Sequence, residues 1–581
     1  MLSENAYMIP DYQRSYAWEV RQRQESRDHQ INDFWEDSLL SFQNHKRIKA
    51  NGDTPAQYYW GTLTVKEESV PRKVGYKEIA QFSIVDGQQR IITLVLLIFA
   101  FHLSTKDKSL YDDYLVIDGY PRLKAGSVNE DTINDVLMKS PNVRGLDLKS
   151  NKRIMAALAF FQKKVDVLDQ TSRSELIDYL LNSTIALHFD TADDRLATQA
   201  FLGLNDRGKP LTNLQKLKGV LVGLDCYYIH SFSSYIDRIF GAIYKAMDHV
   251  NAIGESTFQT YFRDVTDDNF IVLAYHYFAP DAIARYGLSI PHDARASAAG
   301  ALEFFRVSAM TMPSKGTDMG RFVKDLLADL ESVAKALDGM ANLSNAGSNT
   351  DLYRVFGFLN VNPHLVPILV SAHIHNYLTP ELIQEVENVD LRVFKMGGLS
   401  RIAPLYNSVM PHFRDASDAN VVKALKSYWG YWAPDHFFQS YVATLHNKEG
   451  HKYILWRFQK TIDPHFNLLD LSLYGNVTIE HIFAQIPRIT IPGSGFSFPS
   501  DYEATVNLVG NLSLLEHYGK QNLQKAADNL APIDKAKGAY LQSVIPDIFA
   551  LSSSVPAVGF TKNNVDTRTA SIQLFCLNTW R

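Results

Sequence analysis

The first hundred residues show two kinds of hydrophobic pattern. Residues 58–65 (YYWGTLTV) are rich in aromatic and β-branched side chains, which is typical of a β-strand. A second short strand is predicted at 82–85, and a nearly continuous apolar run follows at 91–101. Because this run is too short to cross a bilayer, it predicts a helix that is buried inside the protein.

From about residue 231 the pattern becomes that of a helical protein. Apolar residues between Phe322 and Leu337 recur at intervals of three and four, which predicts a helix with one apolar face. Thr379 and Pro380 predict a helix start, because a capping hydroxyl precedes a proline in the first turn. The middle of the chain is therefore predicted to be mainly helical. The last hundred residues return to short strands, a long loop and helices.

The composition narrows the class of protein. The 581 residues are 46% hydrophobic and 21% charged, a globular balance that excludes wholesale disorder and predicts about three or four domains of roughly 150 residues each. The two cysteines, Cys226 and Cys576, exclude a disulfide framework and a zinc–cysteine site and favour a reducing compartment. The first residues predict no signal peptide. A formal net charge of −5 excludes a polybasic protein and, taken alone, argues against binding nucleic acid over the whole surface.

Three N-terminal segments combine donors for anions with turn-forming residues. Residues 9–18 (IPDYQRSYAW) alternate aromatic and polar side chains around Arg14, whose planar guanidinium suits a phosphate. Residues 86–90 (DGQQR) stand where a strand ends and a helix begins, which is a natural anion site. Residues 201–212 (FLGLNDRGKPLT) form a basic turn before a helix that Thr212 caps.

Each of these segments also has a plain structural interpretation. In the first segment, packing of the N-terminal segment can be the sole role of the aromatic residues. The second can be an ordinary strand-to-helix turn, and it is not a Walker-type phosphate loop, because no GKS or GKT follows it. The third can be a solvated basic turn.

Taken together and in this order, IPDYQRSYAW, DGQQRIITL and LNDRGKPLTNLQKLK resemble the N-terminal domain of GmrSD-type modification-dependent restriction endonucleases, which is related to the ParB/sulfiredoxin fold. The resemblance covers about residues 5–225 and implies a site that binds and hydrolyses a nucleoside triphosphate. It assigns to this site Tyr12, Gln13, Arg14, Asp86, Gly87, Gln88, Gln89, Arg90, Asn205 and Arg207, with Gly208 completing the NxRG box. One departure is Gln215, where the family commonly has an acid before the lysine that is retained here as Lys218.

A second group of polar residues stands near the end of the chain. A short strand from residue 477 ends at Glu480 and His481, a second strand follows Asn511, and a helix is predicted from about residue 520. This order of elements is a ββα arrangement.

The residue types in this arrangement suit phosphodiester hydrolysis. Glu480 and Asn522 offer the hard oxygen ligands that a divalent metal prefers. A neutral His481 can take a proton from an attacking water, and Asn511 can hold the loop that orients His481. The pair Asp435-His436 is followed by no GNL segment or matching asparagine, so it predicts an ordinary helix start.

The series EH, GNLSLL and N resembles the HNH nuclease domain that forms the C-terminal half of the same family, over roughly residues 471–581. The resemblance makes His481 the general base, Glu480 and Asn522 the metal ligands, Asn511 the middle asparagine and Lys537 a phosphate contact. The family's K..Y..S tail is matched by Lys537, Tyr540 and Ser543, and its closing helix by Arg568 and Trp580. EHIFAQ replaces the usual EHILPQ, and Asp534 replaces a common phenylalanine, so that Lys535 is the alternative to Lys537.

The resemblance implies an α+β multi-domain chain in three parts. These are a ParB/sulfiredoxin-like nucleotide-binding and modification-sensing domain at 1–228, a mainly α-helical connector at 229–470, and a ββα-metal HNH nuclease domain at 471–581. It implies an endonuclease, dependent on or regulated by a nucleoside triphosphate, that cleaves or nicks DNA with a modified base or a phosphorothioate backbone in anti-phage defence. The expected cofactors are Mg²⁺ or Mn²⁺ and one of GTP, UTP, CTP or ATP. The expected location is the bacterial cytoplasm, without a membrane partner, and a homodimer is compatible with the resemblance.

Two alternatives stay open. One is a nucleotide-gated DNA-binding sensor whose nuclease domain is inactive, against which the intact set of Glu480, His481, Asn511 and Asn522 argues. The other is a nuclease that acts on RNA or on unmodified DNA. A negative net charge is compatible with DNA binding if the contact is local. The basic residues expected to make this contact are Arg14, Arg207, Lys209, Lys218, Lys520, Lys525 and Lys537.

Overall fold

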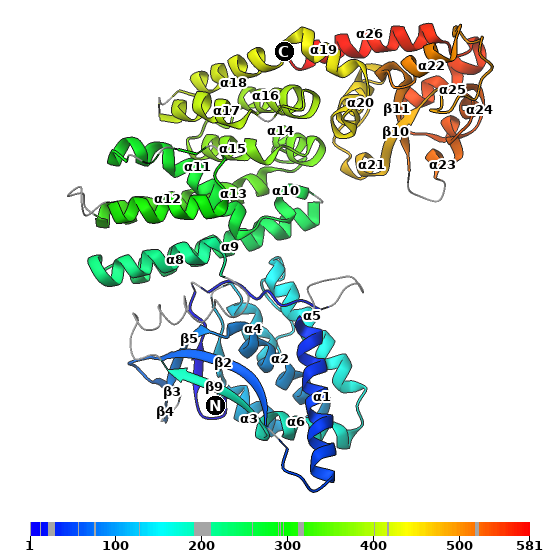
Figure 1. Cartoon of the computed structure of the whole chain (residues 1–581). Coiled ribbons are helices and arrows are strands. Elements are labelled where there is room, and N and C mark those ends of the chain that lie inside the picture. Colours follow the sequence, from blue (N-terminus) through cyan, green and yellow to red (C-terminus); the bar gives the residue numbers. More distant parts are fainter. Residues whose placement is uncertain are drawn as a thin grey trace.

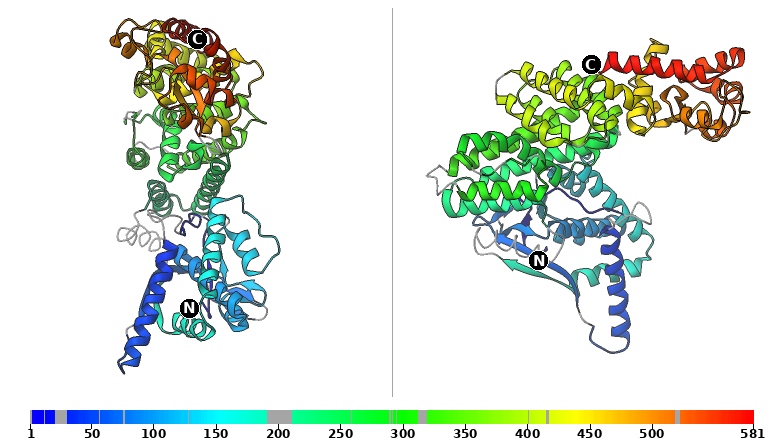
Figure 2. Two further views of the ribbon diagram at one scale, coloured as in Figure 1. Left: turned by 90° about the vertical axis from the view of Figure 1, so that its right-hand side faces the viewer. Right: turned by 45° about the horizontal axis from the view of Figure 1, so that its top comes forward.

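The chain folds into three parts that follow one another in space as they do in sequence. The computed structural model describes residues 2–581 except 12, 21–29, 56, 75–76, 127, 191–210, 258, 289, 291, 294, 312–318, 400, 415–416 and 518–521. An α+β part lies at one end, a stack of helices lies in the middle, and a second α+β part lies at the other end (Figures 1 and 2).

A five-stranded mixed sheet organises the N-terminal part. Its strand order is β8-β1-β5-β2-β9, and these strands are β1 (Ala6–Met8), β2 (Tyr58–Glu67), β5 (Gln81–Asp86), β8 (Leu123–Lys124) and β9 (Thr184–Asp190). Strand β1 runs parallel to β5 and β8, whereas β2 runs antiparallel to β5 and parallel to β9. The strands predicted at 58–65 and 82–85 are confirmed as β2 and β5, which lie side by side in the sheet.

Helices cover this sheet, and one of them is the core of the region. The main helices are α1 (Gln30–Ala50), α2 (Gln88–Thr105), α5 (Lys149–Asp166) and α6 (Gln170–Asn182). The predicted buried helix is confirmed as α2. Among the described helices α2 alone has the length and apolar composition of a membrane span, yet 72% of that stretch is buried inside the molecule. It is therefore placed as the central helix of a packed core.

The middle part is built of helices that stack in layers between the two ends (Figure 1). They are α8 (Asn213–Leu224), α9 (Ser233–Thr257), α10 (Thr260–Arg263), α11 (Asp267–Tyr286), α12 (Ala298–Thr311), α13 (Met319–Leu343), α14 (Thr350–Tyr353), α15 (Val366–Ile374), α16 (Pro380–Val389), α17 (Ile402–Val409), α18 (Asp418–Trp432), α19 (Asp435–Ala443) and α20 (Lys448–Ile462). The predicted helix at 322–337 is confirmed within α13. The predicted start at Thr379 is confirmed too, because its hydroxyl accepts a hydrogen bond from the Leu382 amide at 3.2 Å.

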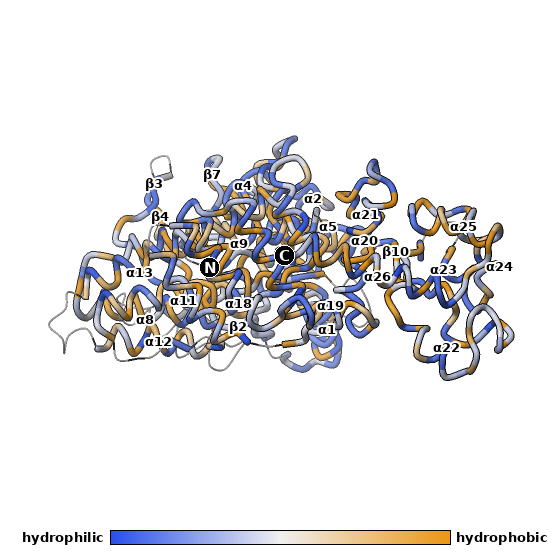
Figure 3. Tube along the Cα trace, turned by 90° about the horizontal axis from the view of Figure 1, so that it is seen from above, coloured by the Kyte–Doolittle hydropathy of each residue, from blue (hydrophilic) through white to orange (hydrophobic). Residues whose placement is uncertain are grey.

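The C-terminal part places two short strands among helices and projects to one side of the stack (Figure 3). Its elements are α21 (Leu471–Asn476), β10 (Val477–His481), α22 (Pro499–Thr505), β11 (Leu512–Glu516), α23 (Leu523–Ala527), α24 (Pro532–Lys537), α25 (Pro546–Val558) and α26 (Lys562–Thr579). Strands β10 and β11 pair antiparallel, with Glu480 opposite Ser513. The predicted order of strand, strand and helix is observed, although α23 begins at residue 523 and is only five residues long.

Three hydrophobic clusters correspond to these parts. The first draws its buried residues from 2–180 and the second from 214–433. The third extends from 358 to 580 and includes side chains of α19 and α20, such as Phe438 and Trp456. The C-terminal core is therefore shared with helices that precede residue 471.

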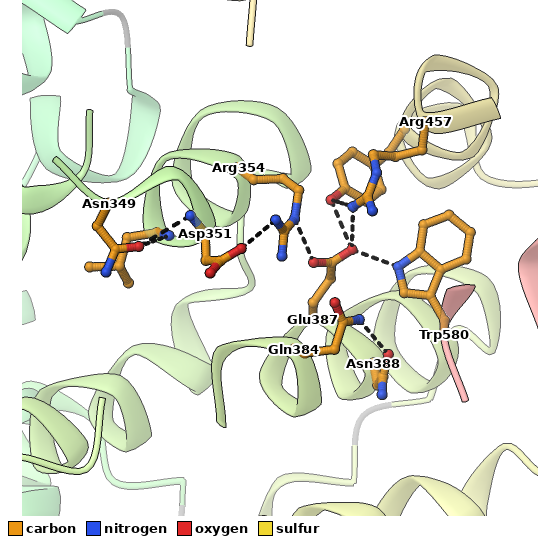
Figure 4. Close-up of polar contacts among 10 residues, drawn as sticks. Asn349, Asp351, Arg354, Gln384, Glu387, Asn388, Arg457 and Trp580 are labelled. Carbon is orange, nitrogen blue, oxygen red and sulfur yellow. Dashed lines mark hydrogen bonds and ion pairs between the residues drawn. The ribbon is translucent and has the colours of Figure 1, made fainter. Parts of the chain in front are cut away.

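A buried polar group fastens the end of α26 to the middle part (Figure 4). The Glu387 carboxylate accepts hydrogen bonds from Trp580 Nε1 at 2.6 Å, Arg354 Nε at 2.8 Å, Arg457 at 2.9 Å and the Tyr453 hydroxyl at 2.9 Å. Burial alone would raise the pKa of Glu387, but the two arginines outweigh burial and hold it below its usual range. The C-terminal helix is thus anchored through an ionised, fully buried carboxylate.

Candidate functional site

The DGQQR segment forms a tight turn between β5 and α2. Strand β5 ends at Asp86, and Gly87 caps the helix with a φ of 97°, a conformation that residues with a side chain rarely adopt. A Cβ at Gly87 would also lie 2.5 Å from Leu63 Cδ2 of the neighbouring strand. Glycine is therefore required here for both backbone conformation and space, and the first amides of α2 have no acceptor within the helix.

The IPDYQR segment packs directly on this turn. Gln13 Nε2 donates to the Val85 carbonyl at 2.8 Å, and the Gln89 side chain accepts from the Ala17 amide at 2.8 Å while donating to the Ser15 carbonyl at 3.3 Å. Residues that are more than 70 positions apart in sequence thus form one site. The role of Gln89 in this arrangement is to hold the two segments together.

Arg90 crosses the neighbouring strand and lines a cavity. Its guanidinium donates to the Thr62 carbonyl at 2.6 Å and lies against Gly61, where a Cβ would be 3.2 Å from Arg90 Nε. The cavity has a volume of about 230 Å³ and includes Trp60 and Leu94 in its walls. Arg90 is therefore positioned at the border between the turn and a mostly apolar cavity.

Two predicted ligand groups of this site have no hydrogen bond or ion pair within the described part of the chain. Asp86 and Arg14 are half-buried, and neither side chain makes a hydrogen bond or ion pair with another residue that the structure describes. Gln88 is buried beside them. The predicted residues Tyr12, Asn205 and Arg207, with Gly208 and Lys209, lie outside the described residues.

In the C-terminal part, His481 ends β10 and is half-buried. Its Nε2 lies 3.2 Å from the Asn507 side-chain oxygen. Burial lowers the pKa of His481, although Asn507 and Glu480 oppose this effect. The imidazole is therefore neutral at pH 7, the form that accepts a proton.

Asn511 holds the loop that follows His481. Its side-chain oxygen accepts from the Phe483 amide at 2.8 Å, and its Nδ2 donates to the carbonyls of Phe483 at 3.0 Å and Val506 at 2.7 Å. The residue is completely buried. These contacts fix the backbone within two residues of His481, which is the positioning role predicted for Asn511.

Glu480 is held in a buried ion pair instead of facing His481 and Asn522. Its Oε1 accepts from Lys535 Nζ at 2.6 Å and from the Tyr540 hydroxyl at 2.9 Å, and its Oε2 accepts from Gln524 at 2.5 Å. Both Glu480 and Lys535 are 2% exposed. Lys535 also donates to the His481 carbonyl at 2.6 Å, so it is the lysine that reaches this site, whereas Lys537 is exposed on α24.

As placed, these side chains do not fit a divalent metal. Three donors occupy the oxygens of Glu480, one of them an ammonium that a cation would have to displace. The Asn522 oxygen caps α23 by accepting from the Lys525 amide at 2.8 Å. No group of three or more His, Cys, Asp or Glu side chains suited to a metal occurs in the part of the chain that the structure describes.

Arg568 holds the backbone on both sides of Asn511. The family resemblance matched this residue only as part of the closing helix. It donates to the carbonyls of Gly510 at 2.8 Å and Leu512 at 3.1 Å and is paired with buried Asp547. A Cβ at Gly510 would lie 2.0 Å from the Val565 carbonyl of α26. The GNL segment is therefore pressed against α26, which explains why glycine precedes Asn511.

Comparison with known families bears on the first of these two sites. Residues 1–222 match the family described as GmrSD restriction endonuclease, N-terminal domain. We call this stretch the GmrSD-like region. It contains the whole sheet, the DGQQR turn and the IPDYQR segment, so the predicted resemblance is confirmed for this part of the chain. No curated protein matches the chain.

The GmrSD-like region is hydrogen-bonded to the helical part through buried side chains. The Tyr16 amide donates to Asn129 Oδ1 at 2.9 Å, Asn129 Nδ2 donates to Ser150 Oγ at 2.9 Å, and Ser150 Oγ donates to Asp248 of α9 at 2.6 Å. Tyr16 belongs to the segment that packs on the DGQQR turn, and its hydroxyl contacts Thr93 of α2 at 2.8 Å. A continuous set of hydrogen bonds therefore joins the candidate nucleotide site to α9.

One basic residue predicted to contact DNA has another role. Lys218 of α8 is buried, and its ammonium lies 3.0 Å from Asp237 Oδ1. Burial lowers the pKa of Lys218 to about 7, although Asp237 opposes this effect. Lys218 is therefore a partner of Asp237 inside the helical part and is not free to bind a phosphate. Gln215, the departure from the family pattern, completes a capping box with Thr212 at the start of α8.

Proposed function

We propose that this chain is a nucleotide-regulated endonuclease of the type IV restriction kind, acting on modified DNA. The observation that carries the proposal is the match of residues 1–222 to the GmrSD N-terminal domain, with the DGQQR turn and the IPDYQR segment joined in one site. The DNA modification is a modified base or a phosphorothioate backbone. The biological role is defence against phage DNA.

Nucleotide binding and hydrolysis are assigned to the DGQQR turn. The first-turn amides of α2 can bind phosphate oxygens, and Arg90 and Arg14 supply positive charge beside them. Asp86 has no ion pair with a described residue, so its carboxylate is available to orient a water molecule. The hydrogen-bonded series from Tyr16 to Asp248 supports a connection between nucleotide state and the helical part.

Phosphodiester hydrolysis is assigned to the HNH-like arrangement around His481. The lowered pKa and the fixed loop of His481 support its role as the general base. A divalent metal, which would supply charge stabilisation at the scissile phosphate, is proposed from the family resemblance alone, because the side chains around Glu480 do not fit one as they are placed. Because Glu480 is paired with Lys535, the one catalytic step that these residues support is the proton transfer to His481.

The ion pair between Glu480 and Lys535 favours a second candidate function. A nuclease domain whose acid stays paired with a lysine would be inactive, and the chain would then be a nucleotide-gated DNA sensor. This candidate predicts nucleotide-dependent DNA binding without cleavage in the presence of Mg²⁺ or Mn²⁺.

A single assay tests the proposed function and separates it from the sensor. The full chain is incubated with plain DNA, glucosylated hydroxymethylcytosine DNA and phosphorothioate DNA, each with GTP, UTP, CTP, ATP or no nucleotide and with Mg²⁺ or Mn²⁺. We expect cleavage of one modified substrate, with a rate that changes when the correct nucleotide is added. Equal cutting of all three substrates would remove modification dependence, and binding without cutting would favour the sensor.

Substitutions in the DGQQR turn should remove nucleotide hydrolysis. Asp86→Ala removes a carboxylate that has no ion pair with a described residue, and Arg90→Ala removes the guanidinium beside the helix start, so we expect each to lower the hydrolysis rate by at least about 10²-fold. The measurement is phosphate release by the purified full chain. Asp112→Ala, which changes an exposed carboxylate of the same region, is the matched control and should hydrolyse normally. Hydrolysis at the normal rate in both site variants would make the turn purely structural.

A further inference from the structure

The helical part contains a cavity that shares no lining residue with either candidate site. Its volume is about 360 Å³, within the range of small-molecule sites, and α11, α13, α15 and the turn Met410–Arg414 surround it. All four elements belong to the described residues of the helical part, between the two candidate sites along the chain. The roles proposed for the two candidate sites therefore leave this space without an assigned function.

One wall of the cavity is aromatic. The His375 ring stacks on Tyr377 and on Phe413, each with a centroid distance of 5.8 Å, and Tyr277 lies 6.0 Å from His375. Burial lowers the pKa of His375, although Asp281 opposes this effect, so the ring is mostly neutral at pH 7. Stacked neutral rings offer π-faces to a flat or positively charged group.

The lining of the cavity also carries acidic side chains. Asp281 and Arg285 both line it and form an ion pair. Arg285 also donates at 2.7 Å to Asp325, which lies outside the lining and is stabilised by Arg321 as well. Asp329 lines the cavity and makes no hydrogen bond or ion pair with another described residue. Burial raises its pKa to about 7, Arg285 opposes this effect, and the two other carboxylates add to it.

A buried hydroxyl without a partner also lines the cavity. Ser371 of α15 is 1% exposed, and its Oγ has no hydrogen-bond partner among the described residues. A buried polar group without a partner is destabilising, and such groups are rare in folded proteins. An unsatisfied hydroxyl in the same lining as Asp329, a carboxylate without a partner among the described residues, therefore indicates that a ligand supplies the missing contact.

We propose that this cavity binds a small organic cation. An ammonium or amidinium group of the ligand is held by the carboxylate of Asp329 and the hydroxyl of Ser371, and a flat apolar body lies against the wall of His375, Tyr377 and Phe413. The lining holds two carboxylates, Asp281 and Asp329, and one guanidinium, which disfavours an anionic ligand. This site is independent of the proposed endonuclease function, because none of its residues belongs to the GmrSD-like region or to the surroundings of His481.

The test compares two probes of the same shape that differ in charge. Benzylammonium and benzyl alcohol are titrated into the full-length protein by calorimetry at pH 8. We expect benzylammonium to bind and benzyl alcohol to bind at least tenfold more weakly. Asp329→Asn should weaken benzylammonium at least tenfold, and Ser371→Ala should weaken it severalfold. Glu331→Gln, on the same helix but not in the cavity, should leave binding unchanged.

The pH dependence in the unmodified protein provides a readout that needs no variant. Since Asp329 has a pKa of about 7, affinity for benzylammonium should rise about tenfold from pH 6 to pH 8 as the carboxylate ionises. The other titratable groups that face it are Tyr277, Asp281, Arg285, Asp325 and His375. Asp329→Asn should remove the pH dependence, which assigns it to this carboxylate.

Three results would overturn the proposal. They are no binding of benzylammonium to the unmodified protein, equal binding of the two probes, and unchanged binding by Asp329→Asn. Each variant is first compared with the unmodified protein by circular dichroism and thermal unfolding. Should Asp329→Asn fail to fold, Ser371→Ala and the pH series decide the question.

Discussion

His481→Ala is expected to abolish DNA cleavage while the protein still hydrolyses nucleoside triphosphate. The imidazole is the one group at the end of β10 that is both neutral and able to accept a proton. Removing a general base costs typically 10²–10⁴-fold in rate, so the cleavage rate should fall by at least about 10²-fold. The measurement is a time course of cleavage on the modified substrate, with phosphate release followed in parallel.

The fold should survive this substitution, which makes the test specific. His481 is half-buried and has one side-chain hydrogen bond, to Asn507, whereas the loop beside it is held by Asn511. The matched control is His436→Ala, which changes an exposed histidine that also follows an acid, at the start of α19. Unchanged cleavage by His481→Ala, or equal loss in both variants, would contradict the nuclease assignment.

Glu387→Ala should be the most destabilising single substitution that we predict. It would leave Arg457 without its carboxylate, Arg354 with Asp351 as its remaining partner, and the Trp580 indole without its acceptor. Breaking one side of a buried ion pair costs about 3–5 kcal/mol. The expected results are a lower denaturation midpoint and faster hydrogen exchange in α16 and α26, since these helices meet at Glu387.

Two further variants separate the charge from the general effect of substitution. Glu387→Gln keeps the size of the side chain and part of its hydrogen bonding, so it should destabilise the protein less than Glu387→Ala. Glu303→Ala removes an exposed carboxylate paired with Arg306 on the surface of α12, and it should leave the midpoint unchanged. Equal midpoints for Glu387→Ala and Glu303→Ala would mean that the buried group is not an anchor.

Local pattern was sufficient to predict the elements that carry both candidate sites. The β-branched run at 58–65, the apolar run after DGQQR and the capped start at Thr379 each formed the predicted element. Asn511 lies beside the loop after His481 and is hydrogen-bonded to it, while its role in catalysis stays a prediction. These features depend on residues that are near in sequence or on a motif with fixed spacing.

The sequence pattern did not predict contacts between segments that are far apart in the chain. Nothing in the sequence around Glu480 indicates that a lysine 55 positions later occupies its carboxylate. A partial indication lies in α24, where Pro532, Lys535 and Ala536 recur at helical spacing, which places Lys535 on the buried face and Lys537 on the exposed one. Lys218 was misassigned for the related reason that a charged residue on an apolar helix face can be paired inside the protein.

The anchor at Trp580 has a consequence for the order in which the protein is made. The contact between Glu387 and Trp580 joins residues that are 193 positions apart, and Arg392 also donates to the Trp580 carbonyl at 2.6 Å. When the ribosome has synthesised β10 and β11, it has not yet synthesised Trp580, the residue that completes this core. Nascent chains therefore carry His481 well before the surrounding structure is finished, and the C-terminal part reaches its final packing only once residue 580 has left the exit tunnel.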